Sequence, residues 1–162
     1  MKLGILQGRL SPPVGGFQEF PKDWEREFRI ADELGLSHID WLVTKNCTVE
    51  SNALFNCTLR GLPIGSICAD NLIDRNIIYF DFLFNELQPI CYNAIKNGID
   101  TITIPLLEAS DVSDVNTRKA FVSNINKFAI TYYPELIFSF EIESYEEAIS
   151  AVINSNDNFR LT

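Results

Sequence analysis

The sequence has a single histidine and no closely spaced pair of cysteines, which limits the chemistry open to its 162 residues. A Ser-His-Asp or Cys-His arrangement would depend on His38, which opens an expected strand at its N-terminal end, the wrong end for catalysis in parallel α/β folds. The four cysteines, at positions 47, 57, 68 and 91, form no CxxC pair. Their spacing is typical of reduced structural thiols, and it does not fit a zinc knuckle or a disulfide framework.

Basic residues and long apolar runs are also scarce. The chain has 13 Lys and Arg against 22 Asp and Glu, a net charge of -9, which argues against a nucleic-acid or anionic-membrane partner. No window of about 18 apolar residues is free of charges, and the N-terminus lacks the apolar region of a signal peptide, so we expect a cytoplasmic protein. There is no linker rich in Gly, Ser or Pro, so residues 1–162 are expected to form one domain around a core drawn from 46% hydrophobic residues.

Short β-like runs alternate with helix-like stretches, strand first each time, which predicts a parallel sheet wrapped by helices. The expected strands are 2–6, 38–43, 64–68, 101–104, 136–140 and 159–162. The expected helices are 23–34, a weak one at 54–60, 79–97 with a kink or a new start at Pro89, 115–132 and 146–153. A (β/α)8 barrel uses roughly 31 residues per unit, so the length predicts about five units, in agreement with the five strand-helix units and one opening strand counted along the chain. A five-stranded doubly wound sheet is the competing architecture, but no GxGxxG or Walker A motif follows the first strand.

The first helix shows the expected division into two sides. Asp23 can cap its N-terminus and Gly35 can end it. Its polar side is expected to carry Glu25, Arg26 and Glu27, and its inward side Phe28, Ala31 and Leu34.

The opening segment MKLGILQGRLSP, residues 1–12, resembles the start of the sugar phosphate isomerase/epimerase family. Members of this family are xylose-isomerase-like (β/α)8 barrels, related to tagatose epimerases and more distantly to endonuclease IV. Four further segments fit the family in order and spacing: 38–41, 66–70, 104–110 and 138–143. The resemblance covers essentially the whole chain and implies an incomplete xylose-isomerase-like parallel (β/α) barrel, with about five and a half of eight units.

The resemblance implies metal-assisted proton transfer next to the carbonyl of a sugar or sugar phosphate. In the family, a Glu, an Asp, a His and a second Glu after strands five to eight hold a divalent metal (Mn, Mg, Co or Zn), and the two Glu residues also move the proton. Only the first ligand maps onto this chain, at Glu141, which is therefore the implied catalytic and metal-binding residue. We expect this chain alone to hold the metal weakly and to show no turnover. Glu143, two residues further on, is interpreted as a solvated loop charge.

Residues after strands one and three are candidate substrate contacts. Gln7 and Arg9 can bind substrate hydroxyls or a phosphate, although an Arg that anchors its own loop is equally consistent. Cys68 and Asp70 occupy a pocket-wall position in relatives. For Cys68 a buried inert thiol is the preferred interpretation, because no base lies nearby in the sequence. For Asp70, a substrate contact and a cap of the next segment are both open.

Two further carboxylates follow later strands. Glu108 comes after the fourth strand and has the same two interpretations as Asp70. Glu147 lies six residues after Glu141, where epimerase relatives carry a substrate-contacting Glu. A carboxylate that is simply favoured at a helix start explains Glu147 equally well.

The alternative function is a non-catalytic, truncated barrel fragment that acts at most as a binding or assembly module. An unclosed barrel would leave two open edges and apolar inner faces, so we expect the chain either to self-associate through these edges or to be marginally stable and aggregate. A repair enzyme of the endonuclease IV type is disfavoured by the net charge of -9 and the shortage of histidine ligands.

Overall fold

The computed structural model describes residues 2–12, 19–49, 51–52, 61–73, 76–143 and 146–162. These residues form an α/β fold with one six-stranded sheet, in which the strands follow their sequence order and every neighbouring pair is parallel. The strands are β1 (Gly4–Leu6), β2 (His38–Val43), β3 (Ile64–Ala69), β4 (Thr101–Leu106), β5 (Ile137–Ile142) and β6 (Phe159–Leu161). The helices are α1 (Trp24–Glu33), α3 (Phe80–Lys96), α4 (Val115–Tyr132) and α5 (Glu146–Ile153), with 3-10 turns η1 (Asp70–Leu72) and η2 (Glu108–Ser110).

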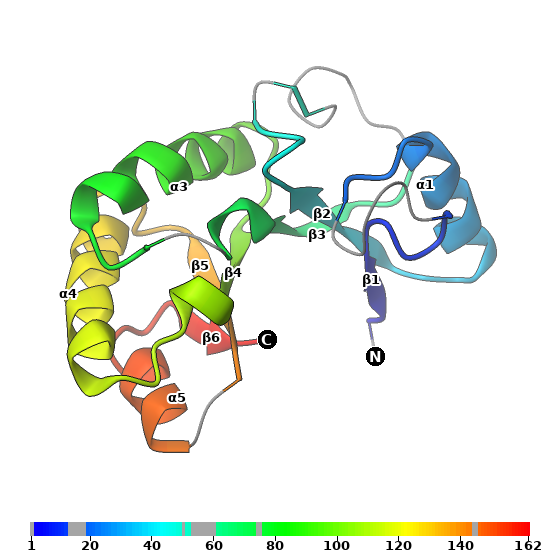
Figure 1. The fold of residues 1–162 in the computed structure, drawn as a ribbon. Helices are drawn as coiled ribbons and strands as arrows, with labels where there is room; N and C mark the ends of the chain where they lie inside the picture. Colours follow the sequence, from blue (N-terminus) through cyan, green and yellow to red (C-terminus); the bar gives the residue numbers. More distant parts are fainter. Residues whose placement is uncertain (1, 13–18, 50, 53–60, 74–75, 144–145) are drawn as a thin grey trace.

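Sequential order places β1 at one edge of the sheet, whereas a doubly wound sheet would place it in the middle. The sheet is consistent with part of a parallel βα barrel. In Figure 1, α3, α4 and α5 form an arc outside the strands, and α1 lies at the other end of the molecule near β1 and β2.

The element boundaries agree closely with the sequence prediction, with three differences. Strand β1 is shorter than expected, and β4 and β5 are longer, so Pro105 and Glu141 lie inside strands. Helix α3 runs through Pro89 as one element and does not start afresh there. The weak helix expected at 54–60 lies outside the described residues.

The outer face of the sheet packs against the helices and forms the hydrophobic core. The pleat alternates side chains between the two faces, so every second strand residue points toward the helices. Phe138 and Phe159 stack edge to face with ring centroids 6.1 Å apart, and Phe140 meets Phe121 of α4 at 5.8 Å. The remaining fully buried strand residues of this core are Ile39, Trp41, Val43, Ile67, Ala69, Ile102, Ile104 and Leu106.

The inner face, which carries no helix, is mostly polar, and the expectation of an apolar inner face is therefore wrong. Ser66, Thr103 and Ser139 alternate along their strands with the core residues and are nearly buried. The Ser66 hydroxyl donates a hydrogen bond of 2.8 Å to Asp40 Oδ1, and Thr103 Oγ1 donates to Ser66 Oγ at 3.4 Å. Side chains of this face satisfy one another across neighbouring strands, so the face needs no apolar cover.

Three details of helix α1 differ from the sequence prediction. Phe28 and Ala31 are buried as expected, and Gly35 with φ of 72° follows the end of the helix. Leu34, expected to point inward, is 64% exposed, whereas Glu27, expected on the polar side, is 1% exposed. Asp23 occupies the N-cap position, but its side chain makes no capping hydrogen bond.

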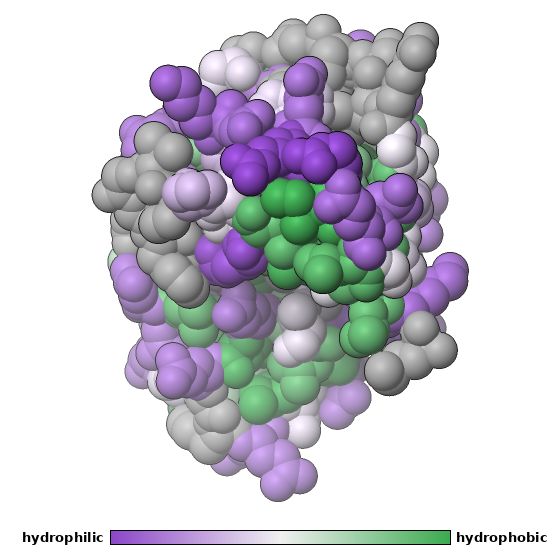
Figure 2. Space-filling model, turned by 90° about the vertical axis from the view of Figure 1, so that its right-hand side faces the viewer, coloured by the Kyte–Doolittle hydropathy of each residue, from purple (hydrophilic) through white to green (hydrophobic). Residues whose placement is uncertain are grey.

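The sheet has two edges, β1 and β6, which do not pair with each other. Leu3 beside β1 and Leu161 in β6 are 55% and 50% exposed. The face at the β1 and α1 end of the molecule shows hydrophobic surface gathered in a central area with hydrophilic residues around it (Figure 2). Within the described residues, none of the helices combines the length and apolar character needed to cross a membrane.

Candidate functional site

The C-terminal ends of β1, β3, β4 and β5 bring together most of the residues singled out in the sequence. Parallel strands end at the same edge of a sheet, so residues that follow different strands become neighbours there. Arg9, Glu108 and Glu141 all act electrostatically on Asp70. These charged residues therefore lie at one edge of the sheet, around Asp70.

Asp70 is the central carboxyl of this group. It begins η1 directly after β3 and is only 7% exposed. Burial and, next, the nearby Glu141 carboxylate raise the pKa of Asp70 to about 6. A carboxyl with such a pKa exchanges protons near neutral pH, as a general acid or base must. Asp70 occupies the first position of the 3-10 turn, directly after Ala69 at the N-cap position.

Cys68 is an inert thiol. It is 7% exposed on the inner face of β3. Burial, followed by the charges of Asp70 and Glu141, raises the pKa of Cys68 to about 12. A thiol with this pKa forms almost no thiolate at neutral pH, so Cys68 shapes the site and does not act as a nucleophile.

Glu141 and Glu108 lie on neighbouring strand ends. Glu141 is exposed within β5 and stands in register with Pro105 of β4. Glu108 is exposed and has φ of 50°, a left-handed conformation that is costly for a residue with a side chain and recurs at functional sites. Glu143 is exposed as expected but is not isolated, because it lines a cavity of about 260 Å³ together with Glu108. The other lining residues are Leu106, Leu107, Asp111 and Ser113.

Two cations accompany the carboxylates. The positive charges of Lys45 and Arg9 both lower the pKa of Asp70, and Arg9 also lowers that of Cys68. Lys45 follows β2 and was not identified from the sequence. Its position two residues after the end of β2 was the available signal, because β2 ends at the same edge as its neighbours.

Gln7 holds the backbone of the sheet. It is 1% exposed, its backbone N–H donates to Asp40 O at 3.0 Å, and its side-chain Oε1 accepts from Leu42 N at 3.1 Å. Its Nε2 finds no partner among the described residues. Gln7 was expected to contact a substrate, but its amide oxygen is already bonded to β2, and only its amide nitrogen remains for another contact.

Glu147 is exposed in the first turn of α5. A carboxylate at this position is favoured by the helix dipole, which is the structural alternative expected from the sequence.

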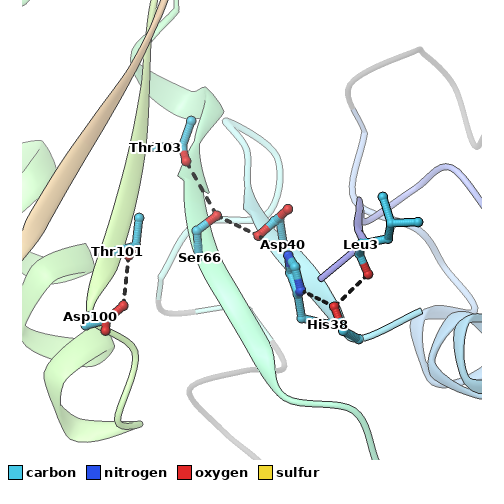
Figure 3. Close-up of polar contacts among 8 residues, drawn as sticks. Leu3, His38, Asp40, Ser66, Asp100, Thr101 and Thr103 are labelled. Carbon is cyan, nitrogen blue, oxygen red and sulfur yellow. Dashed lines mark hydrogen bonds and ion pairs between the residues drawn. The ribbon is translucent and has the colours of Figure 1, made fainter. Parts of the chain in front are cut away.

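Toward the other end of the strands, His38 occupies a close-packed position on the inner face. Its Nδ1 is 2.9 Å from Ser37 Oγ, and its Nε2 is 3.9 Å from Asp40 Oδ1 (Figure 3). The space next to the imidazole is supplied by glycines, because a Cβ at Gly4 or Gly65 would overlap the ring. His38 is therefore a structural residue of the N-terminal part of the sheet, as the sequence predicts.

The divalent metal implied by the family resemblance was tested against the residues present. Among the described residues, no three His, Cys, Asp or Glu side chains are grouped to hold a metal ion. No divalent metal is assigned to these residues.

A larger cavity of about 550 Å³ lies away from this chemistry. It is lined by Glu25, Phe28, Arg29 and Asp32 of α1 and by residues 61–63, which lead into β3. Arg29 forms an exposed ion pair with Glu33 at 3.0 Å on the same helix. None of the charges acting on Asp70 comes from this cavity, so the sheet edge is the better candidate site.

Comparison of the chain with models of known protein families and with curated proteins finds no match. The fold and the grouping of charges at the sheet edge therefore carry the functional argument.

Proposed function

We propose that the chain binds a sugar or sugar phosphate at the C-terminal edge of its sheet and belongs to the xylose-isomerase-like sugar isomerases and epimerases. The observation that supports this most is the convergence of Asp70, Glu108 and Glu141 with Arg9 and Lys45, from five successive strand ends. Carboxylates can accept sugar hydroxyls as hydrogen-bond donors, and the two cations can bind a phosphate.

Asp70 and Glu141 are the proposed proton-transfer residues. A carboxylate takes the proton from the carbon beside the carbonyl, and the electron pair of the C–H bond moves to the carbonyl oxygen to give an enediolate. Return of a proton to the former carbonyl carbon, with transfer of the hydroxyl proton to the former carbonyl oxygen, gives the isomer. Return of a proton to the opposite face of the original carbon gives the epimer. Burial of Asp70 beside the Glu141 carboxylate raises the pKa of Asp70 to about 6, so Asp70 can give or take a proton near neutral pH.

Arg9 and Lys45 have a different part in this proposal. Their charges compensate the carboxylates around Asp70 and can offset the negative charge of an enediolate or a phosphate. The guanidinium of Arg9 suits two-point contacts with a phosphate, whereas Lys45 acts as a point charge.

Proton exchange tests this function more sensitively than net turnover. The chain is incubated in deuterated water with fructose or fructose 6-phosphate, and deuterium incorporation beside the carbonyl is followed by proton NMR. We expect incorporation in the wild type and a decrease of at least about tenfold in Asp70→Asn and Glu141→Gln. Glu33→Gln, an exposed change on α1, is the matched control. Incorporation that is absent, or that survives both substitutions, contradicts the proposal.

The two open edges favour a second candidate, a binding or assembly module without catalysis. Unpaired edge strands can pair with another chain, and Leu3 and Leu161 add exposed apolar surface beside them. Light-scattering mass across a dilution series tests this candidate. We expect a concentration-dependent mass that falls to the monomer in Leu161→Lys, and a monomer at all concentrations contradicts it.

A further inference from the structure

The buried carboxylate of Glu27 has no place in the chemistry described so far. It belongs to α1, is 1% exposed, and reaches the loop that follows β1. Its Oε2 accepts from Gly8 N at 2.8 Å, and its Oε1 accepts from Leu10 N at 3.0 Å and from Ser11 Oγ at 2.7 Å. A buried carboxylate is costly unless it is bonded in this way, and such charge-assisted bonds are among the stronger ones.

The packing of α1 does not require this carboxylate. Phe28 and Ala31 supply the apolar contacts of the helix with the core. An apolar residue at position 27 would satisfy the same packing, but it would leave the Gly8 and Leu10 amides without their acceptor. The carboxylate of Glu27 is therefore required by the amides of the loop and not by the packing of α1 against the sheet.

The bonded amides lie on both sides of Arg9. Glu27 fixes the residue before Arg9 and the residue after it, so the backbone from which Arg9 projects is held at two points. Gly8 makes the turn possible with φ of 87°, and a Cβ there would come within 3.3 Å of the Glu19 carbonyl oxygen.

Arg9, which follows β1, acts electrostatically on residues of β3, a strand that is not next to β1. Strand β1 pairs with β2, and β2 pairs with β3, which carries Cys68 and leads to Asp70. The charge of Arg9 reaches both of these residues across the intervening strand. A long side chain loses much rotamer freedom when it is held in one direction, so a fixed backbone reduces what remains to be ordered.

We propose that Glu27 is a positioning residue, which fixes the backbone on both sides of Arg9 and so directs the guanidinium toward the carboxylates at the sheet edge. That the fixed backbone presents Arg9 to an anionic group of the substrate rests on the proposed function. The positioning itself can be measured without any substrate.

The direct test is NMR relaxation and amide exchange of the full chain carrying Glu27→Gln. This substitution keeps the shape but replaces one acceptor oxygen with an NH2 group that faces donors. We expect the Nε–Hε order parameter of Arg9 to fall toward that of exposed Arg29, and the Gly8 and Leu10 amides to exchange about tenfold faster. Arg118, buried in α4, is the internal reference and should not change.

Two further variants keep the test decisive. Glu25→Gln makes the same chemical change at an exposed site of the same helix, and it should leave Arg9 unaffected. Ser11→Ala removes a single hydrogen bond to Glu27 and should loosen Arg9 to a smaller extent, even if Glu27→Gln does not fold. Unchanged Arg9 order in Ser11→Ala and in any folded Glu27→Gln overturns the proposal, as does equal loosening in Glu25→Gln.

Binding of inorganic phosphate to the same variants separates this inference from the proposed function. Weaker phosphate binding together with a loosened Arg9 supports both. A loosened Arg9 in a protein that binds neither phosphate nor sugar phosphate supports the positioning and contradicts the proposed function.

Discussion

The two faces of the sheet share one backbone but differ in almost every side chain. One row of residues in register across β2 to β6 points toward the helices, and the next row points to the inner face. The outer row is Trp41, Ile67, Ile102, Phe138 and Phe159. The inner row is Leu42, Cys68, Thr103, Ser139 and Arg160.

Because of this difference, the outer side chains stabilise the fold, and the inner side chains are the ones that can bind a ligand. Outer side chains contribute by removing large apolar surfaces from water, about 1.5–3 kcal/mol each. Inner side chains contribute smaller net energies through hydrogen bonds such as that of Ser66 with Asp40. The inner face and its C-terminal edge are therefore free to carry charges such as Asp70 and Glu141 without loss of the core.

The largest effect is expected on the outer face, for Phe140→Ala. Phe140 is fully buried and meets the rings of Phe121 and Phe159 at centroid distances of 5.8 and 5.0 Å. Truncation leaves a cavity, so the free energy of unfolding should fall by about 3–5 kcal/mol in urea titrations. A loss below about 1 kcal/mol would contradict the larger contribution of the outer face to the free energy of unfolding.

The next effect concerns the close-packed inner position at Gly65. A Cβ there would overlap the His38 ring and approach Asp40, so Gly65→Ala should lower the free energy of unfolding by about 1–3 kcal/mol. The His38→Ala background should restore part of this loss, because the ring is then gone. Equal losses in both backgrounds, measured by thermal unfolding, would show that the ring is not the obstacle.

A stabilising change is expected at the edge of the inner face, for Asp70→Asn. The pKa of Asp70 is raised to about 6 in the folded chain, from 3.8 when unfolded, so its ionised form is disfavoured by folding. The contribution of Asp70 to the stability of the wild type is therefore greatest below pH 3.8 and is lost as pH rises through 6. At pH 7, Asp70→Asn should be about 1–2 kcal/mol more stable than the wild type, allowing for solvent screening. Urea titrations at pH 4 and 7 measure the difference in the free energy of unfolding between the two proteins. A variant that is less stable than the wild type at pH 7 contradicts the prediction.

The smallest effect is expected for Ser66→Ala on the inner face. The substitution removes the hydrogen bond to Asp40 Oδ1 and an acceptor for Thr103, and Asp40 keeps partial access to water. The free energy of unfolding should fall by about 0.5–1 kcal/mol in urea titrations. A loss as large as that of Phe140→Ala would mean that the inner face contributes to stability as the outer face does.

Much of the fold could be predicted from the sequence because the signals are local. The strand at 38–43 and the helices at 115–132 and 146–153 have the predicted bounds, set by short apolar runs and periodic apolar positions. The polar inner face could also have been predicted, from the alternation of polar and apolar residues in Thr-Ile-Thr-Ile at 101–104 and Phe-Ser-Phe at 138–140. It was missed because the inner face of an unclosed barrel was expected to be apolar.

The candidate site could be predicted only as far as strand ends determine it. Arg9, Asp70, Glu108 and Glu141 each follow or end a strand, which is enough to gather them at one edge. The burial of Glu27 could not be read from α1, because its partners are backbone amides of a loop far away in the sequence. Lys45 follows its strand by two residues, and no motif distinguished it from an ordinary surface lysine.

The most direct test of the shared site is a carbon-13 NMR titration of the Asp70 carboxyl in the wild type and in Glu141→Gln. We expect a pKa of about 6 for Asp70 in the wild type and a lower value in Glu141→Gln, because one charge that raises the pKa is removed while burial remains. Glu33→Gln, on the outer helix α1, should leave the titration unchanged. A wild-type pKa of Asp70 near 3.8, or a value that does not respond to Glu141→Gln, would contradict the shared site.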